Sequence, residues 1–155
     1  MSKTERITSL LQPEHINLNI TATDKEPALR EIAGLLANHD AVKDFEMFFS
    51  EVLQREKVSN TALGHAVAIP HARTDQCQQI VFAIGRSSDG IAFEAKDDLP
   101  VHLVFLIGTP KAMVADYLRI VGNLARLLRR DELREELLQA ETPESFIQLL
   151  SEAGG

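Results

Sequence analysis

Apolar and polar residues alternate over residues 16–20, and this period of two is typical of a half-buried β-strand. Two later segments, residues 80–84 and 101–107, are almost continuously apolar, which is typical of central strands covered by helices on both faces. A shorter apolar run at residues 66–69 predicts another strand, which we expect to stop at Pro70. The pattern therefore predicts a sheet whose middle strands are buried.

A turn is predicted at Ser87-Ser88-Asp89-Gly90, because Ser, Asp and Gly favour turn conformations. The Ile-Ala-Phe stretch at residues 91–93 then forms a candidate hairpin partner for the preceding strand. A hairpin of this kind makes the predicted sheet mixed rather than wholly parallel.

Apolar residues at three- and four-residue spacing predict helices on both sides of this apolar middle part. The first follows a capping signal at residues 23–26, and the second covers residues 45–57. After the last strand we expect a long helix over residues 113–128 and a shorter one capped by Asp131. A third opens at Thr142-Pro143, because Pro is tolerated at the first helical position.

Helices that flank a run of buried strands imply the α/β class, with a three-layer α/β/α sandwich around a central mixed sheet. The length of 155 residues and the absence of repeats or linkers predict a single domain over residues 1–155. Hydrophobic residues make up 45% of the chain, enough for a sizeable core.

The formal net charge of −7, from 23 acidic and 16 basic residues, argues against a large nucleic-acid surface, which needs clustered Lys and Arg. Cys77 is the only cysteine, so an intramolecular disulfide is excluded. No apolar run has the length of a membrane span, and the first residues lack the apolar stretch of a signal peptide. We therefore expect a cytoplasmic protein without direct membrane insertion.

The sequence has no Gly-rich phosphate loop, no dinucleotide fingerprint and no Gly-x-Ser-x-Gly motif, so we expect no bound cofactor. The segment that stands out runs from Thr61 to Arg73, as a loop, a buried strand and a sharp stop with a histidine at position 71. A metal site made of His65, His71 and Cys77 is not expected, because a regular six-residue spacing matches no common zinc pattern.

Two readings of His71 remain: a histidine without function, or a nucleophilic imidazole. A neutral imidazole is a good nucleophile near pH 7, and the position between Pro70 and the small Ala72 is rigid and sterically open. Arg55, the Thr61 hydroxyl and the amides around Gly64 are candidate donors to phosphoryl oxygens. Arg55 can equally cap a helix end, and Thr61 can be an ordinary turn residue.

Three segments tip the balance toward phosphoryl transfer: Arg55-Glu56-Lys57, Thr61-Ala62-Leu63-Gly64 and Val67-Ala68-Ile69-Pro70-His71-Ala72. They resemble the active-site signature of enzyme IIA domains of the fructose/mannitol branch of the bacterial sugar phosphotransferase system, which here runs from Glu56 to Ala72. A second block, residues 93–105, is similar to the same family, and the resemblance covers essentially the whole chain.

The resemblance implies that His71 accepts a phosphoryl group from the phosphohistidine of the phosphocarrier protein HPr and passes it to the cysteine of an enzyme IIB protein or domain. Arg55 would steady the phosphoryl group, while Thr61 and the Gly64 loop would shape its pocket. The IIB motif is absent around Cys77, which implies a stand-alone IIA, a phosphotransferase component of sugar uptake.

Two positions depart from the family pattern. Many members carry a second histidine near the start of the long helix after the last strand, and Tyr117 occupies this position here, with Arg119 close by. A Tyr hydroxyl can hydrogen-bond to a phosphate or an imidazole, but it does not change charge near neutral pH. His65 is a further candidate for a supporting role near His71.

Two alternatives stay open from the sequence. One is a regulatory paralogue, like the nitrogen-related IIA proteins, which controls target proteins through its phosphorylation state. The other is a non-phosphorylated binding module on the same fold.

Overall fold

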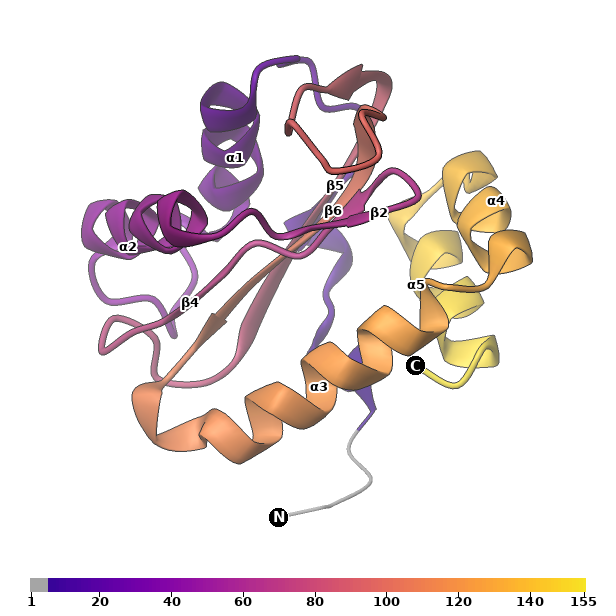
Figure 1. The fold of residues 1–155 in the computed structure, drawn as a ribbon. Coiled ribbons are helices and arrows are strands. Elements are labelled where there is room, and N and C mark those ends of the chain that lie inside the picture. Colours follow the sequence, from indigo (N-terminus) through magenta and orange to yellow (C-terminus); the bar gives the residue numbers. More distant parts are fainter. Residues whose placement is uncertain (1–5) are drawn as a thin grey trace.

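Residues 6–155, the part of the chain that the computed structural model describes, form a six-stranded mixed sheet between two layers of helices (Figure 1). The strand order is β1-β5-β6-β3-β2, and β4 also pairs with β6. The strands are β1 (Ile16–Asn17), β2 (Ala62–Gly64), β3 (Val67–Ala68), β4 (His71–Arg73), β5 (Val81–Ile91) and β6 (Val101–Thr109). The long pair β5 and β6 is antiparallel, whereas β1 runs parallel to β5, and β3 and β4 run parallel to β6.

The α-helices of the described residues are α1 (Lys25–Ala33), α2 (Phe45–Val58), α3 (Val114–Leu127), α4 (Asp131–Gln139) and α5 (Pro143–Glu152). Short 3-10 helices are η1 (Ile7–Leu10), η2 (Pro13–His15), η3 (Gly34–Leu36) and η4 (Lys111–Met113). None of the helices within residues 6–155 combines the length and the apolar character that crossing a bilayer requires.

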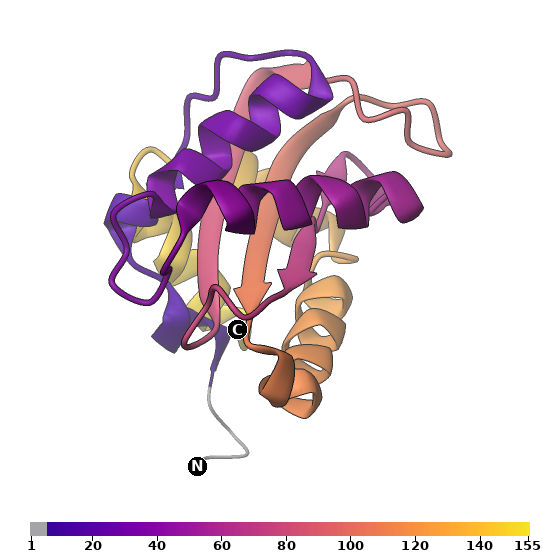
Figure 2. The ribbon, with the colours of Figure 1, turned by 90° about the vertical axis from the view of Figure 1, so that its left-hand side faces the viewer.

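The helices divide between the two faces of the sheet. One apolar core lies under α1 and α2, and the other lies under α3, α4 and α5 (Figures 1 and 2). Strands β5 and β6 contribute side chains to both cores, which is why their sequences are almost continuously apolar. The predicted three-layer α/β/α sandwich with a mixed sheet is confirmed.

The packing of α2 against β6 is close because Gly108 has no side chain. A Cβ atom at Gly108 would lie 2.7 Å from Cε1 of Phe48 and 2.8 Å from Sγ of Cys77. Phe48 is on α2, so this glycine sets how near the helix lies to the sheet.

The strand predicted over residues 16–20 is shorter in the structure, where β1 ends at Asn17. The side chain of Asn17 accepts a hydrogen bond from the backbone N–H of Asn19 at 2.8 Å, a local bond that replaces the ladder. The alternation itself is correct, since Ile16, Leu18 and Ile20 are all buried.

The turn predicted at residues 87–90 is wrong, because β5 continues through it to Ile91. The ladder with β6 shifts register between Arg86 and Ile91, and the backbone N–H of Gly90 donates to Oγ of Ser87 at 2.9 Å. The turn residues therefore form an irregularity inside one long strand.

The strand predicted over residues 66–69 is β3, which ends at Ala68, before Pro70, and pairing with β6 resumes in a separate strand at His71. Pro70 lacks an N–H, but its carbonyl accepts the backbone N–H of Ile107 at 2.9 Å. The proline thus separates β3 from β4, which begins at His71.

The helix ends are predicted with mixed success. Thr142 caps α5 in a reciprocal capping box with Ser145, as expected from the sequence. Asp131 does not cap α4: it is the first helical residue, and its carboxylate is paired with Arg134. Arg130 occupies the capping position instead.

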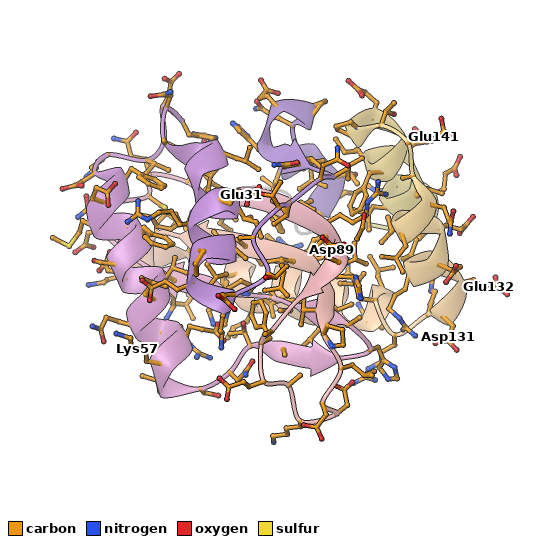
Figure 3. All side chains as sticks on the ribbon, turned by 90° about the horizontal axis from the view of Figure 1, so that it is seen from above. Glu31, Lys57, Asp89, Asp131, Glu132 and Glu141 are labelled. Carbon is orange, nitrogen blue, oxygen red and sulfur yellow. The ribbon has the colours of Figure 1, made fainter. Side chains whose placement is uncertain are left out.

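Acidic residues are concentrated on the C-terminal helices. Residues 131–152 contain seven acidic residues and one basic residue, so this segment carries −6 of the formal −7. Figure 3 shows Asp131 and Glu132 at the opposite side of the molecule from Lys57 at the end of α2. The remainder of the chain is close to neutral.

Candidate functional site

The imidazole of His71 is held in one orientation by the backbone beside it. Its Nδ1 lies 3.0 Å from the carbonyl oxygen of Ile69, and the residue is half-buried at the start of β4. A carbonyl oxygen only accepts hydrogen bonds, so Nδ1 carries the proton in this contact. In the neutral ring the lone pair is then on Nε2, which is the nucleophilic nitrogen.

The surroundings of His71 favour the neutral ring. Burial lowers the pKa of His71 below its ordinary value of 6.5, and the positive charges of Arg55 and Arg73 act in the same direction. The hydrogen bond to Ile69 and the charge of Glu56 oppose part of this effect on the pKa. A lowered pKa leaves the imidazole unprotonated, and therefore nucleophilic, near pH 7.

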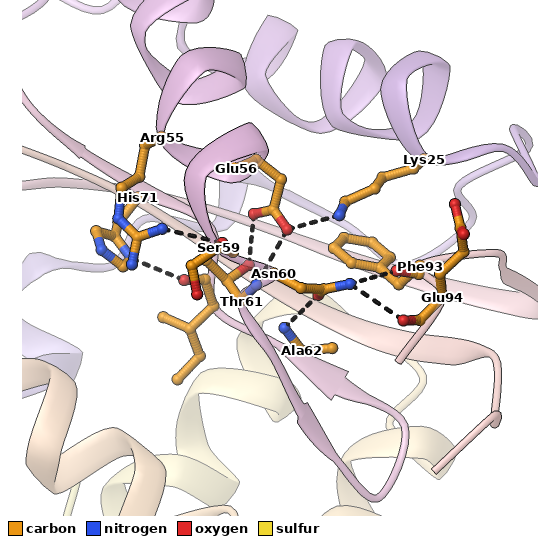
Figure 4. Close-up of polar contacts among 11 residues, drawn as sticks. Lys25, Arg55, Glu56, Ser59, Asn60, Thr61, Ala62, His71, Phe93 and Glu94 are labelled. Carbon is orange, nitrogen blue, oxygen red and sulfur yellow. Dashed lines mark hydrogen bonds and ion pairs between the residues drawn. The ribbon is translucent and has the colours of Figure 1, made fainter. Parts of the chain in front are cut away.

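Arg55 lies in the last turn of α2, next to His71 (Figure 4). Its Nη1 donates to the carbonyl oxygen of Ser59 at 2.9 Å, which fixes the guanidinium against the chain that leaves the helix. The same guanidinium carries further N–H donors, whose planar arrangement suits phosphoryl oxygens.

Tyr117 of α3 approaches His71 from the other layer of helices. The two ring centroids are 5.2 Å apart at an interplanar angle of 48°, and Tyr117 is buried. Burial raises the pKa of Tyr117, while the charges of Arg55 and Arg73 lower it. The hydroxyl therefore remains a hydrogen-bond donor near pH 7. The same two arginines act on both rings, so the four side chains form one site.

Thr61 does not direct its hydroxyl proton at His71. The hydroxyl donates to Oε1 of Glu56 at 2.7 Å, and the backbone N–H donates to Oε2 at 3.0 Å. Both residues are buried, and Nζ of Lys25 forms an ion pair with Oε2 of Glu56 at 2.7 Å (Figure 4). The structure thus places Thr61 as an anchor of the loop after α2.

Gly64 and His65 shape the hairpin between β2 and β3. Gly64, His65 and Ala66 have φ angles of 86°, 55° and 69°, and positive φ at the two central residues is the mark of a type I′ turn. The backbone N–H of His65 donates to Oδ2 of Asp97 at 3.0 Å, and its side chain is exposed. His65 thus lies in the turn between β2 and β3, where its backbone is bonded to Asp97.

The surroundings of the single cysteine, Cys77, do not favour a nucleophilic thiolate. Cys77 is buried, and burial raises the pKa of its thiol to about 12, so the thiol stays protonated. Among residues 6–155, no group of three or more His, Cys, Asp or Glu side chains is arranged to hold a metal ion.

The family model described as the phosphoenolpyruvate-dependent sugar phosphotransferase system, EIIA 2, matches residues 9–153. The chain belongs to this family. The match confirms the resemblance that the segments around His71 predict.

Two relatives show how EIIA 2 sequences occur alone and within longer proteins. A fructose-specific EIIA component of Haloferax volcanii is 34% identical over 146 residues, which cover 94% of this chain and 95% of that protein. A fructose-specific EIIABC component of Bacillus subtilis is 35% identical over 147 residues, which cover 95% of this chain and only 23% of that protein.

The fold is also that of solved EIIA 2 structures. The crystal structure of nitrogen regulatory protein IIA-Ntr from Neisseria meningitidis superposes with a TM-score of 0.87 at 28% identity, covering 93% of this chain and 98% of that one. Similarity thus extends to both sugar-specific and nitrogen-regulatory members of the EIIA 2 family.

Sequence reasoning missed the role of Lys25 and the burial of Glu56 in this EIIA 2 chain. A signal for Glu56 was present, because it lies four residues after Val52 and so continues the apolar stripe of α2. A carboxylate on a buried stripe requires a partner. Lys25 could not be identified as that partner, since it lies on another helix.

Proposed function

We propose that this chain is a phosphohistidine carrier, in which His71 accepts a phosphoryl group from the phosphohistidine of HPr and passes it to the cysteine of an enzyme IIB. The observation that carries the proposal is the contact of His71 Nδ1 with the Ile69 carbonyl, which leaves the lone pair on Nε2. Both partners are proteins of the cytoplasm in this proposal, and no cofactor is required.

In the accepting step, the lone pair of His71 Nε2 forms the new bond to phosphorus. The nitrogen–phosphorus bond of the donor breaks, and its electron pair stays on the donor imidazole, so no proton has to move. The His71 ring gains positive charge as the bond forms, and the Ile69 carbonyl that accepts Nδ1–H stabilises this charge.

The side chains around the ring suit the incoming group. A phosphoryl group brings roughly −1.5 to −2 charges near pH 7. The positive charges of Arg55 and Arg73, which already act on His71, offset that charge. The Tyr117 hydroxyl adds a neutral donor at the position where many family members have a histidine.

A second candidate function is regulation of target proteins by the phosphorylation state of His71. The end-to-end similarity to nitrogen regulatory protein IIA-Ntr favours it. Both functions share the accepting step and differ in the fate of the phosphoryl group. A carrier for sugar uptake passes the group to an enzyme IIB, whereas a regulator keeps it and changes its affinity for a target protein.

The test is a phosphorelay with purified protein, phosphoenolpyruvate, enzyme I and HPr, using His71→Ala as the variant and His15→Ala as a matched control. We expect acid-labile phosphate on the wild type and the control, and none on His71→Ala. Transfer onward to an added enzyme IIB separates the carrier from the regulator. No label on the wild type while HPr is fully phosphorylated would contradict the proposal and favour a non-phosphorylated binding module.

A further inference from the structure

A series of hydrogen bonds leads from the buried carboxylate of Glu56 through Thr61 and Ile69 to the imidazole of His71, and Figure 4 shows its start at Glu56 and Thr61. Glu56 accepts from the hydroxyl and the backbone N–H of Thr61. The carbonyl of Thr61 accepts the backbone N–H of Ile69 at 3.1 Å, and the carbonyl of Ile69 accepts from Nδ1 of His71 at 3.0 Å. The bond between Thr61 and Ile69 joins two backbone groups, whereas Glu56 and His71 take part through their side chains.

Glu56 is the fixed point of this series. Its side chain is 5% exposed, and Lys25 Nζ provides a third partner at 2.7 Å. A buried carboxylate without partners is strongly unfavourable, so the three donors hold it in a single position. Lys25 is itself oriented by the ring of Phe93, with Nζ 4.9 Å from the ring centroid.

Asn60 holds the same loop from its other side. Its Nδ2 donates to the carbonyl of Phe93 at 2.6 Å, and its Oδ1 accepts the backbone N–H of Ala62 at 2.9 Å. We therefore expect the loop to stay folded when one anchor is removed, and loss of Glu56 to displace the Ile69 carbonyl rather than unfold the protein.

We propose that Glu56, held by Lys25, is a positioning residue for His71, and that it acts through Thr61 and Ile69 to fix the imidazole with its proton on Nδ1. The role is additional to the proposed carrier function and rests on it for its biological meaning. Glu56 touches neither the phosphoryl group nor the reacting nitrogen.

The direct test is the tautomer of His71 in the unphosphorylated protein, read from its ring nitrogen chemical shifts by NMR. Glu56→Gln keeps the shape of the side chain, but its amide N–H₂ group replaces an oxygen that accepts hydrogen bonds from Thr61 or Lys25. We expect the fraction of His71 with its proton on Nδ1 to fall, and the midpoint of its titration to move lower because a negative charge is lost. Glu46→Gln, an exposed carboxylate on the same helix, is the control.

The second measurement is the rate of phosphorylation by HPr. We expect Glu56→Gln to lower the maximal rate about tenfold, the usual size of effect for outer partners of a reacting group, with the KM for HPr unchanged. Thr61→Val, which lacks the hydroxyl, should lower the maximal rate to a similar extent. Thr61→Ser should keep the rate of the wild type, since Ser keeps the hydroxyl. Lys25→Met should lower the rate, while Lys43→Met at an exposed lysine should not.

The proposal is overturned if Glu56→Gln matches Glu46→Gln in tautomer, titration midpoint and maximal rate, whatever happens to the melting temperature. A fall in melting temperature alone would show a purely structural role. If HPr does not phosphorylate the wild type at all, the carrier function fails. The tautomer comparison still decides the positioning role in that case, because it needs no phosphorylation.

Discussion

The proposed reactivity of His71 depends on one contact and on burial, which have different effects. The Ile69 carbonyl determines which nitrogen carries the proton, and burial determines that the ring is neutral near pH 7. These effects act together, since a protonated ring would have no lone pair with which to attack phosphorus. The site therefore depends on backbone geometry as much as on the charged side chains around it.

A dependence on pH is expected at this residue. Because the pKa of His71 is lowered below 6.5, we expect phosphoryl acceptance from HPr to persist to lower pH than it would with an unperturbed imidazole, and to decline as the pH falls through the lowered pKa. The titration of the His71 Cε1 proton by NMR should give a midpoint under 6.5. A midpoint above that value would contradict the effect of burial on this ring.

The same shift affects stability, with a definite sign. The unfolded chain takes up a proton on this histidine near pH 6.5, whereas the folded chain does so only at lower pH. The contribution of His71 to stability is therefore complete above pH 6.5 and is lost as the pH falls through the pKa of the folded state. The melting temperature of His71→Asn should fall less over this range than that of the wild type. Burial also lowers the pKa of His15, which contributes to the loss with the same sign.

At this scale the sequence predicts the candidate site residues but not their contacts. His71, Arg55 and Tyr117 are identified by motif and resemblance, and the structure brings all three together. The donor expected from Thr61 is instead directed at Glu56. No local pattern predicts that bond, because it depends on where a helix end and a loop meet in three dimensions.

Among the elements, α2 has the most direct influence on the site, because it carries both Arg55 and Glu56 and packs on β6 at Gly108. Gly108→Ala would push the Cβ atom against Phe48 and Cys77. We expect a loss of about 1–3 kcal/mol in the free energy of unfolding, measured by denaturant titration. Phosphorylation by HPr should also slow, since the helix must shift.

Gly122→Ala is the matched control. Gly122 lies inside α3, and a Cβ atom there would meet nothing within 4 Å. Alanine favours a helix interior over glycine, so we expect a gain of about 0.5–1 kcal/mol. An equal loss in the free energy of unfolding for both substitutions would show that the close packing at Gly108 does not contribute to stability.

Element by element, the sequence predicts the long helices well and the strand ends poorly. The apolar spacing of α2 and α3 and the Thr142-Pro143 start of α5 are local signals, and the structure confirms them. The turn predicted at residues 87–90 is wrong, because pairing with β6 outweighs local preference there. The strand does stop before Pro70, but the sequence does not predict that pairing with β6 resumes at His71.

Across the whole molecule, the negative charge is concentrated in residues 131–152, and Figure 3 shows Asp131 and Glu132 of this segment on the side opposite Lys57 at the end of α2. Within α4, Glu132 and Glu136 are four residues apart on an exposed face and repel each other. We expect the melting temperature to rise when salt is added from low ionic strength to about 0.15 M, because salt screens this repulsion.

The double variant Glu132→Gln with Glu136→Gln should reduce that rise. The control is Glu46→Gln with Asp89→Asn, two exposed carboxylates outside the acidic segment. Removing these should leave the salt effect in place. An equal reduction by both double variants would show that the total charge matters and its location does not.

The interruption at Pro70 also protects the sheet from unwanted assembly. The strands at the borders of the sheet are short: β1 has two residues, and β2 and β4 have three each. At β4 the proline supplies no free N–H, and the exposed Arg73 closes the strand with a charge. We therefore expect that this border of the sheet does not accept an added strand from another chain.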